Sequence, residues 1–503
     1  MELITFFLCF IIFLFMVTRL FRKTTKKLPP GPTPFPIIGN IHQLNGPLPH
    51  RTMADLAKKY GPLMHLQLGQ VSTLVVSSAE AAKPFLNDHD TIFANRPFLL
   101  STFILNYKQQ DIAFSPYGSY WRQMRKIATV ELLSARRVQS FRSIREEEVH
   151  NLIKSIAAQN GSVFNFSKTL PLVTYSFIAQ AAFGKRSEFH EEFIALMEEV
   201  IQLMGGFSLV DLYPNVKILE TITGARNKLE KMRVRVDAIL QSILDHHRNK
   251  RSAEEPTKQD GTEEMDLVDV LLNVQKSGEF GDPLTDDNLK GVIYDIFTAG
   301  GETSSTTLLW AMLEMIKNPE VFQKAQAEVR KVFDGQGNAD ESKLHELKYM
   351  EAVIKETLRL HPAAPLLLPR ESSEQCEIDG YVIPAKTRVV VNAFAIARDP
   401  KYWDEPERFN PERFMDSDID FKGKNLFYIP FGAGRRICPG ISFALPNMEL
   451  PLAQLLYHFD WKLPGQMKPE DVDMTEIFGL TVGPKNDLCL IPTTHHLSTF
   501  YQK

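Results

Sequence analysis

Among the four cysteines in the 503 residues, Cys438 has the neighbours best suited to chemistry. It lies in the segment Phe-Gly-Ala-Gly-Arg-Arg-Ile-Cys-Pro-Gly, residues 431–440, with glycines on both sides. Glycine lets a main chain turn sharply and approach a side chain, here the sulfur. Backbone N–H groups placed in this way stabilise the thiolate, the form of cysteine that binds metals. Such surroundings suit a thiolate, although a buried, inert thiol is the usual state of a lone cysteine.

A second unusual segment, Ala-Gly-Gly-Glu-Thr at residues 299–303, falls in the middle of a long predicted helix. This helix begins near Thr285 with capping residues and ends before Asn318 and Pro319, which gives it a length of about 50 Å. Each glycine inside a helix costs about 1 kcal/mol relative to alanine. A long buried helix that contradicts its own propensity suggests a function. Taken alone, the segment is explained equally well by a kink or by close helix packing.

The cysteine segment resembles the haem-binding loop of the cytochrome P450 family, F-x-x-G-x-R-x-C-x-G. Every fixed position of that pattern is filled, by Phe431, Gly434, Arg436, Cys438 and Gly440. The resemblance implies a haem b cofactor whose iron is bound by the Cys438 thiolate, a ligand that favours O–O cleavage. It also implies that Phe431 covers the sulfur and that Arg436 pairs with a haem propionate.

Further segments resemble other motifs of the family, in the same order along the chain. Glu356 and Arg359 match the E-x-x-R of its K helix, one helical turn apart on one face. Arg413 matches the arginine of the partner motif F-x-P-x-R-F. The resemblance implies that these three residues form a buried network that supports the ligand loop. Arg408 stands in a duplicate of the motif, ahead of the family position, and is expected at the surface.

The resemblance extends to residues that would contact the haem propionates. Trp121 and Arg125 match the W-x-x-x-R of the family's C helix, whose tryptophan and arginine meet the propionates. Arg370 is expected to contact the cofactor as well. All these motifs occur in order over most of the chain, and together they are far more specific than any one of them.

The mid-helix segment resembles the family's oxygen-activation motif, A/G-G-x-D/E-T, with Glu302 in place of the commoner aspartate. The resemblance implies that Gly300 leaves room for O2 above the iron. It further implies that Glu302 and Thr303 relay protons to the bound oxygen, which is acid–base work by positioned side chains. Since both residues are present, a family variant specialised for rearrangement without O2 is disfavoured.

The N-terminus predicts a membrane anchor. The first 18 residues are almost wholly apolar, which is just long enough to span a bilayer, and basic residues follow from Arg19 to Lys27. A cleaved signal peptide fits less well, because no basic region precedes the apolar run. The segment 28–36 then holds five prolines and predicts a stiff, extended spacer. We therefore expect an anchor at residues 1–20, a basic and proline-rich hinge at 21–36, and one catalytic domain at 37–503.

The remaining pattern predicts a mainly α domain with a small β region, the cytochrome P450 fold. Hairpin or strand patterns occur at 65–76, 376–383 and 388–392, and helical periodicity occurs at 143–158, 191–204, 225–247 and 318–333. The polar stretch 249–264 predicts an exposed loop. The formal net charge of −4 gives no indication of a nucleic-acid partner. So few, scattered cysteines favour a reduced compartment.

The resemblance covers essentially the whole chain and is closest to plant microsomal P450s that include terpene hydroxylases and some alkaloid oxidases. By analogy, the segments that line the distal pocket are almost wholly apolar and carry no charge, which favours a neutral lipophilic substrate. We expect hydroxylation of a terpenoid, with oxidation of an indole-type alkaloid as the alternative. The residues expected to line this pocket are Phe98, Phe207, Ala299, Gly300, Leu366, Leu367 and Phe478.

The resemblance also implies partners and a location. Electrons would come from NADPH through a cytochrome P450 reductase with an acidic docking surface, and the enzyme would sit in the endoplasmic reticulum membrane with its catalytic domain in the cytosol. Basic residues on and after the Trp121 helix could steer that partner: Arg122, Arg125, Lys126, Arg136, Arg137, Arg142 and Arg145. Two other classes are disfavoured. A haem-binding sensor has no need of Glu302 and Thr303, and a secreted peroxidase does not fit the thiolate loop.

Overall fold

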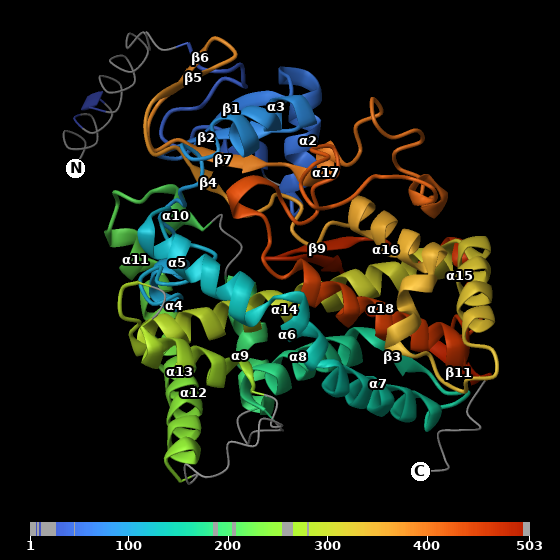
Figure 1. The fold of residues 1–503 in the computed structure, drawn as a ribbon. Helices are drawn as coiled ribbons and strands as arrows, with labels where there is room; N and C mark the ends of the chain where they lie inside the picture. The colour runs from blue at the N-terminus through green and yellow to red at the C-terminus, as the bar shows by residue number, and fades with distance from the viewer. Residues whose placement is uncertain are drawn as a thin grey trace.

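The computed structural model describes residues 27–44, 46–184, 190–203, 208–253, 265–278 and 281–495, with Phe7, Phe10 and Ile11. The fold is mainly helical with small sheets, as the sequence predicts (Figure 1). Its longer helices are α2 (Pro49–Tyr60), α5 (Ser119–Ile127), α7 (Arg142–Ala157), α8 (Phe166–Phe183), α9 (His190–Leu203), α12 (Ala225–Ala253), α13 (Leu267–Ser277), α14 (Asp286–Lys317), α15 (Pro319–Val332), α16 (Lys348–Leu360) and α18 (Ile441–His458). The shorter ones are α3 (Ala79–Lys83), α4 (Leu100–Leu105), α6 (Ala135–Ser140), α10 (Leu209–Leu212), α11 (Ile218–Ile222) and α17 (Ala393–Ile396).

Helix α14 runs through the middle of the molecule and is buried over most of its length (Figure 1). Thr285 caps it, and Thr285 and Asn288 form a reciprocal capping box, so the helix begins within one residue of the predicted start. Two apolar cores share it. Residues 289–297 pack with α8, α12 and α13, while residues 308–316 pack with α7, α15, α16 and α18. This central helix carries residues 299–303 between the two cores.

The main sheet has the strand order β1-β2-β7-β4, from β1 (Leu63–Leu68), β2 (Val71–Val76), β7 (Arg388–Val391) and β4 (Arg370–Glu371). Strands β1 and β2 form the predicted hairpin, and β2 pairs with β7 in parallel, with Thr73 opposite Arg388. The smaller sheets contain β3 (Phe164–Asn165), β5 (Cys376–Ile378), β6 (Tyr381–Ile383), β8 (Phe459–Lys462), β9 (Glu476–Phe478), β10 (Val482–Pro484) and β11 (Cys489–Thr494). The main sheet therefore brings Arg370 and Arg388, on neighbouring strands, into one layer.

The helix predictions agree with the structure within two residues at each end, with one exception. Helix α12 continues to Ala253, six residues beyond the predicted end at His247, so the predicted loop at 249–264 starts too early. Arg248 explains the difference, because it forms an ion pair with Asp286 at the start of α14 and anchors the last turns. Residues 254–264 lie outside the described part of the chain.

The predicted anchor at residues 1–20 lies almost wholly outside the described residues. Within the part of the chain that the structure describes, no helix has the length and apolar character to cross a membrane. The described end of the predicted hinge lies against the domain: the carbonyl of Lys27 accepts from Val382 N, and that of Pro30 from His65 N. The boundaries of the anchor, hinge and catalytic domain stay predictions.

Candidate active site

Cys438 stands in a tight loop between a 3-10 turn, η6 (Gly434–Arg436), and the start of α18. Its N–H donates to the carbonyl of Phe431 at 2.9 Å, and the N–H of Gly440 donates to its Sγ at 3.3 Å. Gly434 has a φ of +69°, and a Cβ there would lie 2.1 Å from the carbonyl oxygen of Leu86. This glycine is therefore required for the loop to dock against its neighbour. The glycine that contacts the sulfur is Gly440.

The surroundings of the Cys438 sulfur act on its pKa in opposite directions. Burial raises the pKa of the thiol, whereas the Gly440 N–H and the positive charge of Arg125 lower it. Burial is the largest of these effects. A bound metal cation would oppose it, because a coordinating thiol loses its proton.

A cavity with a volume of about 310 Å³ lies directly over Cys438. Cys438, Phe431 and Phe443 line one side, and Ala299, Gly300 and Thr303 of α14 line the other. The remaining walls come from the loop after α16 and from the 106–114 segment, and most of their side chains are apolar. The structure thus brings the cysteine loop and the mid-helix motif to opposite faces of one chamber, although they are far apart in the sequence.

The two glycines of α14 have different roles. A Cβ on Gly301 would lie 2.4 Å from the ring of Tyr175 in α8, so this glycine allows the two helices to pack closely. Gly300 lines the cavity, where a Cβ would also press on Ile178. Close helix packing and an open space above Cys438 are therefore both present, at adjacent positions.

The acidic residue of the motif is held by a distant threonine. Glu302 Oε1 accepts a hydrogen bond of 3.2 Å from Thr481 Oγ1, which lies between β9 and β10 and lines the cavity. Thr303 Oγ1 donates to the carbonyl of Ala299 at 2.7 Å. Thr303 itself lines the cavity, as does Thr481, so Thr481 links Glu302 to the same chamber.

Four arginines converge on the same chamber: Arg96, Arg125, Arg370 and Arg436. Burial lowers the pKa of Arg436 to about 9, with further lowering by Arg370, and burial lowers the pKa of Arg370 to about 10. In the described part of the chain, Arg370 Nη1 is buried and has no hydrogen-bond partner. Burying a positive charge without a paired anion costs free energy, so this cluster favours the binding of a negatively charged ligand. The two propionates of a haem fit this cluster.

Two of the predicted haem contacts are also engaged in holding the loops around the chamber. Arg436 donates to the carbonyls of Ala94, Ile112 and Ser115 at 2.8, 3.2 and 2.6 Å. Trp121 Nε1 donates to the same Ile112 carbonyl at 3.0 Å. Arg370, with its unpartnered Nη1, therefore has the donor best placed for a propionate. The propionate contacts of Trp121 and Arg436 stay predictions.

The residues matched to the E-x-x-R motif form a buried network next to the ligand loop. Arg359 makes two hydrogen bonds to Glu356, at 2.7 and 2.8 Å, and both side chains are fully buried. Arg413 donates to Glu356 at 3.0 Å, and so does the backbone N–H of Asn410, at 2.8 Å. The Arg408 side chain is 66% exposed, on the surface as the motif comparison predicts.

The other predicted pocket residues are distributed over two cavities. Leu367 lines the main cavity, whereas Leu366 and Phe478 line a smaller neighbouring one. Phe98 lines neither: it is 42% exposed and stacks near Lys217, so its prediction as a pocket residue does not fit the structure. Phe207 lies outside the described residues.

The sequence analysis missed a carboxyl in the wall of the chamber. Asp295 of α14 lines the main cavity and accepts from the N–H groups of Ile112 and Ala113, at 2.6 and 3.0 Å. Asn106 donates to both Asp295 and Asp111. Burial, followed by the neighbouring Asp111, raises the pKa of Asp295. An acidic residue one helical turn before Ala299 in an otherwise apolar stretch was the available signal.

Comparison with known proteins decides the family. The sequence profile described as "Cytochrome P450" matches residues 29–490. The chain is a cytochrome P450. It is 53% identical to tabersonine 16-hydroxylase 2 of Catharanthus roseus, over 98% of each chain, and 50% identical to premnaspirodiene oxygenase of Hyoscyamus muticus, over 99% of each. A solved zebrafish cytochrome P450 with abiraterone superposes with a TM-score of 0.75 at 27% identity, over 89% of this chain and 99% of that one.

As a cytochrome P450, the protein is a haem-thiolate monooxygenase. The residues around the chamber fit that cofactor: Cys438 for the iron, and Arg370, Arg125 and Arg436 for the propionates. When bound, the haem activates O2, and a thiolate ligand favours O–O cleavage. The chain's own residues line the chamber with Phe431, Phe443 and Thr303 and hold Glu302 next to it through Thr481.

Proposed function

We propose that this cytochrome P450 inserts one oxygen atom from O2 into a neutral, lipophilic plant metabolite, with electrons from NADPH. The observation that supports this most is the chamber itself, about 310 Å³ between Cys438 and the α14 motif. Apolar residues such as Ile296, Phe114, Leu368 and Leu480 form much of its lining. A pocket of this kind selects by shape and by burial of apolar surface.

A terpenoid is the substrate class that we favour, with hydroxylation as the reaction. The 50% identity to premnaspirodiene oxygenase supports it, as does the apolar lining. An indole-type alkaloid is the second candidate, because the chain is 53% identical to tabersonine 16-hydroxylase 2 and 54% identical to tabersonine 6,7-epoxidase isoform 1. The position attacked depends on how the substrate is held relative to the iron, where shifts of about 1 Å matter.

In this proposal Cys438 is the iron ligand, and Glu302 and Thr303 move protons. Thr303 lines the chamber and can pass a proton to oxygen bound there, whereas Glu302, held by Thr481, can resupply the proton. A non-catalytic haem sensor would not need this pair. Consumption of NADPH on addition of substrate, with formation of an oxygenated product, separates the two functions.

The proposed partner is an NADPH–cytochrome P450 reductase, and the proposed location is the endoplasmic reticulum membrane, held by the single anchor at residues 1–20. Arg122 and Lys126 of α5 are exposed, and Arg435 beside the ligand loop is half-exposed. Arg145 does not belong to this basic surface: it is buried and paired with Glu341 at 2.5 Å. Extraction of the full-length chain from microsomes by alkaline carbonate would contradict the anchor.

The function is tested by expressing the chain in microsomes together with a reductase. A panel of sesquiterpenes, diterpenes and indole alkaloids is offered under ¹⁸O2, and products are read by mass spectrometry. We expect a terpenoid product that has gained one labelled oxygen atom and that requires NADPH. Products from the alkaloids alone would support the second candidate. If neither the terpenoids nor the alkaloids gave an NADPH-dependent product, the proposal would be contradicted.

A further inference from the structure

A second cavity adjoins the main chamber on its sheet side. Its volume is about 70 Å³, and it shares Phe114, Leu367 and Leu368 with the chamber. That volume exceeds the roughly 10–15 Å³ that a single water needs, so a small functional group fits inside. Leu367, which lines both spaces, has a φ of +49°, a backbone conformation that costs energy for a leucine. Strain of this kind tends to persist at functional positions.

One charged side chain faces this otherwise apolar space. Arg388, on strand β7, lines the second cavity and is only 5% exposed. Its Nη2 makes one long hydrogen bond, 3.4 Å, to the backbone carbonyl of Asp211. Within the described part of the chain, its Nε is buried and has no acceptor. A buried donor left without a partner costs about 1–3 kcal/mol, and more when it belongs to a charged group.

The nearest carboxylates are committed to other partners. Asp211 accepts from Leu100 N at 2.8 Å and from Ser208 Oγ at 2.7 Å. Glu371, on the neighbouring strand, is paired with Lys386 at 2.9 Å. The guanidinium of Arg388 therefore keeps a donor available toward the cavity.

We propose that the second cavity is a subsite of the active site that binds an acceptor oxygen of the ligand, a carbonyl or carboxylate, through Arg388. This rests on the proposed function, since the ligand would lie across both cavities. The apolar skeleton would pass Leu367 into the main chamber, with its reacting carbon over Cys438. Within the neutral class proposed above, the subsite favours lipophilic molecules with a carbonyl or ester group at the end remote from the oxidised carbon. It also extends that class to molecules with an acid group at the same end.

The test uses three probes of similar shape: laurate, methyl laurate and dodecane. Their dissociation constants are measured by calorimetry on the detergent-solubilised holoenzyme, for wild type, Arg388→Met, Arg388→Lys and the control Lys424→Met. Lys424 is an exposed basic residue that lines neither cavity. The wild type should bind laurate or methyl laurate at least about tenfold more tightly than dodecane. Arg388→Met should lose that preference, Arg388→Lys should keep part of it, and Lys424→Met should match the wild type.

The same preference in Arg388→Met as in the wild type overturns the subsite. The subsite is also overturned if the wild type binds the three probes with equal dissociation constants, or binds none of them. If Arg388→Met fails to fold, the wild type is tested instead with methyl laurate labelled with ¹³C at its carbonyl. The infrared stretching band of that carbonyl is then compared before and after binding. A shift to lower wavenumber on binding supports the hydrogen bond, and an unshifted band contradicts it. All these readouts report binding without turnover, so absence of an oxygenated product would sink the proposed function and leave this result standing.

Discussion

Residue by residue, the proposed proton path depends on a contact between distant parts of the chain. Glu302 lies on α14, and the hydroxyl that holds it belongs to Thr481, 179 residues later. Motif comparison located Glu302 and Thr303, because both belong to one short local pattern. It could not locate Thr481, since nothing in the sequence indicates which residue the β9–β10 turn brings to α14. For the same reason, motif comparison did not indicate that Arg388 lines the second cavity.

Replacing Thr481 with valine should uncouple oxygen activation. Valine keeps the shape of the side chain but cannot donate to Glu302, so the carboxylate loses its position for proton resupply. We expect peroxide released per NADPH oxidised to rise several-fold, toward the level of Glu302→Ala and Thr303→Ala. Thr481→Ser restores the hydroxyl and should restore coupling, together with the wild-type solvent isotope effect on product formation. Equal coupling in Thr481→Val and the wild type would contradict this role.

At the level of helices and loops, the Glu356 network joins α16 to the segment before the ligand loop. Arg359 donates to the carbonyls of Ala397 and Pro406 as well as to Glu356, so one helix fixes several turns of irregular chain. The sequence predicted the pairing of these motif residues and most helix ends, because both follow from local patterns. It could not place the carbonyl partners, which depend on the path of loops without periodicity.

Glu356→Ala should reduce the amount of folded holoprotein without changing which product forms. Its removal leaves Arg359 as a buried cation without its partner, at a cost of typically about 3–5 kcal/mol. The measurements are haem content per protein, thermal midpoint and product ratio. Arg408→Ala is the matched control, because its guanidinium is exposed and pairs only near the surface with Glu405. A normal haem yield with a shifted product ratio in Glu356→Ala would argue for a role in the pocket instead.

The contact between α14 and the 106–114 segment should make stability depend on pH. Burial raises the pKa of both Asp111 and Asp295 in the folded protein. Both carboxyls bind protons more tightly in the folded protein than in the unfolded chain, where the pKa of an aspartate is about 3.9, so their protonation stabilises the fold at low pH. This stabilisation is lost as the pH rises from the unfolded pKa through the raised pKa values of the folded protein. Asp295→Asn removes one titrating group and can still accept from Ile112 N and Ala113 N.

When the pH is raised from about 5 to about 8, we therefore expect the thermal midpoint of unfolding to fall less for Asp295→Asn than for the wild type. Asp287→Asn is the control, since Asp287 is an exposed acid on the same helix. Parallel midpoint curves for Asp295→Asn and the wild type would show that the pair does not titrate in this range.

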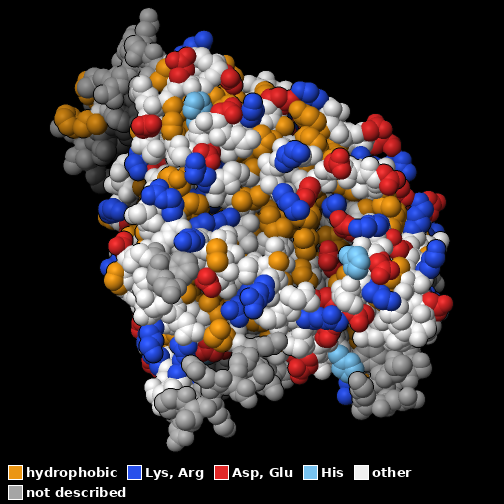
Figure 2. All heavy atoms as spheres, viewed as in Figure 1, with side chains coloured by type: hydrophobic (Ala, Val, Ile, Leu, Met, Phe, Trp, Pro, Cys, Tyr) orange, Lys and Arg blue, Asp and Glu red, His pale blue; other side chains and the backbone are white. Residues whose placement is uncertain are grey.

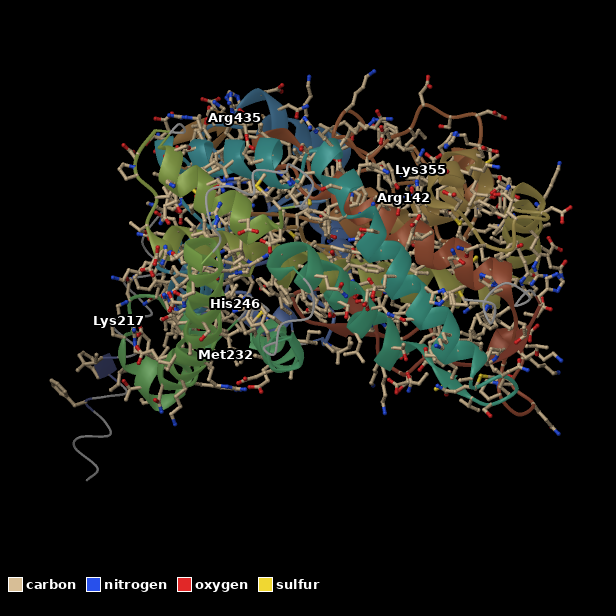
Figure 3. The ribbon with its side chains drawn as sticks, turned by 60° about the horizontal axis from the view of Figure 1, so that its bottom comes forward. Arg142, Lys217, Met232, His246, Lys355 and Arg435 are labelled. Atoms are coloured by element: carbon tan, nitrogen blue, oxygen red, sulfur yellow. The ribbon has the colours of Figure 1, made fainter. Side chains whose placement is uncertain are left out.

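Across the whole molecule, charge is distributed in both signs. On the face shown in Figure 2, basic and acidic side chains are interspersed, with apolar residues exposed between them. Docking of a reductase must therefore depend on a local group of basic residues. Figure 3 shows Arg435 and Lys217 on different parts of the molecule, so charge reversal at the two can be compared. Net charge could be predicted from composition, whereas this distribution depends on the fold, which buries Arg145 and leaves Arg122 exposed.

Charge reversal at Arg122 or Lys126 should slow reduction of the haem by the reductase at low salt. The bimolecular rate constant for the reaction with the reductase should decrease, because long-range attraction speeds the encounter of the two proteins more than it tightens their complex. The difference from the wild type should shrink as salt rises, since the Debye length falls from about 30 Å at 0.01 M to about 10 Å at 0.1 M. Stopped-flow reduction measures it, with Lys217→Glu as the control. A mutant as fast as the wild type at low salt would exclude these residues from docking.

The identity of the iron ligand is tested most directly by the spectrum of the reduced enzyme with carbon monoxide. The wild type should show the red-shifted Soret band of a thiolate-ligated haem, and Cys438→Ser should lack it. Cys489→Ser, which changes a half-buried cysteine away from the chamber, should keep the band. Haem content is measured in all three proteins, so that loss of the band is distinguished from loss of haem. A Cys438→Ser protein that binds haem and retains the red-shifted band would contradict the assignment of Cys438 as the ligand.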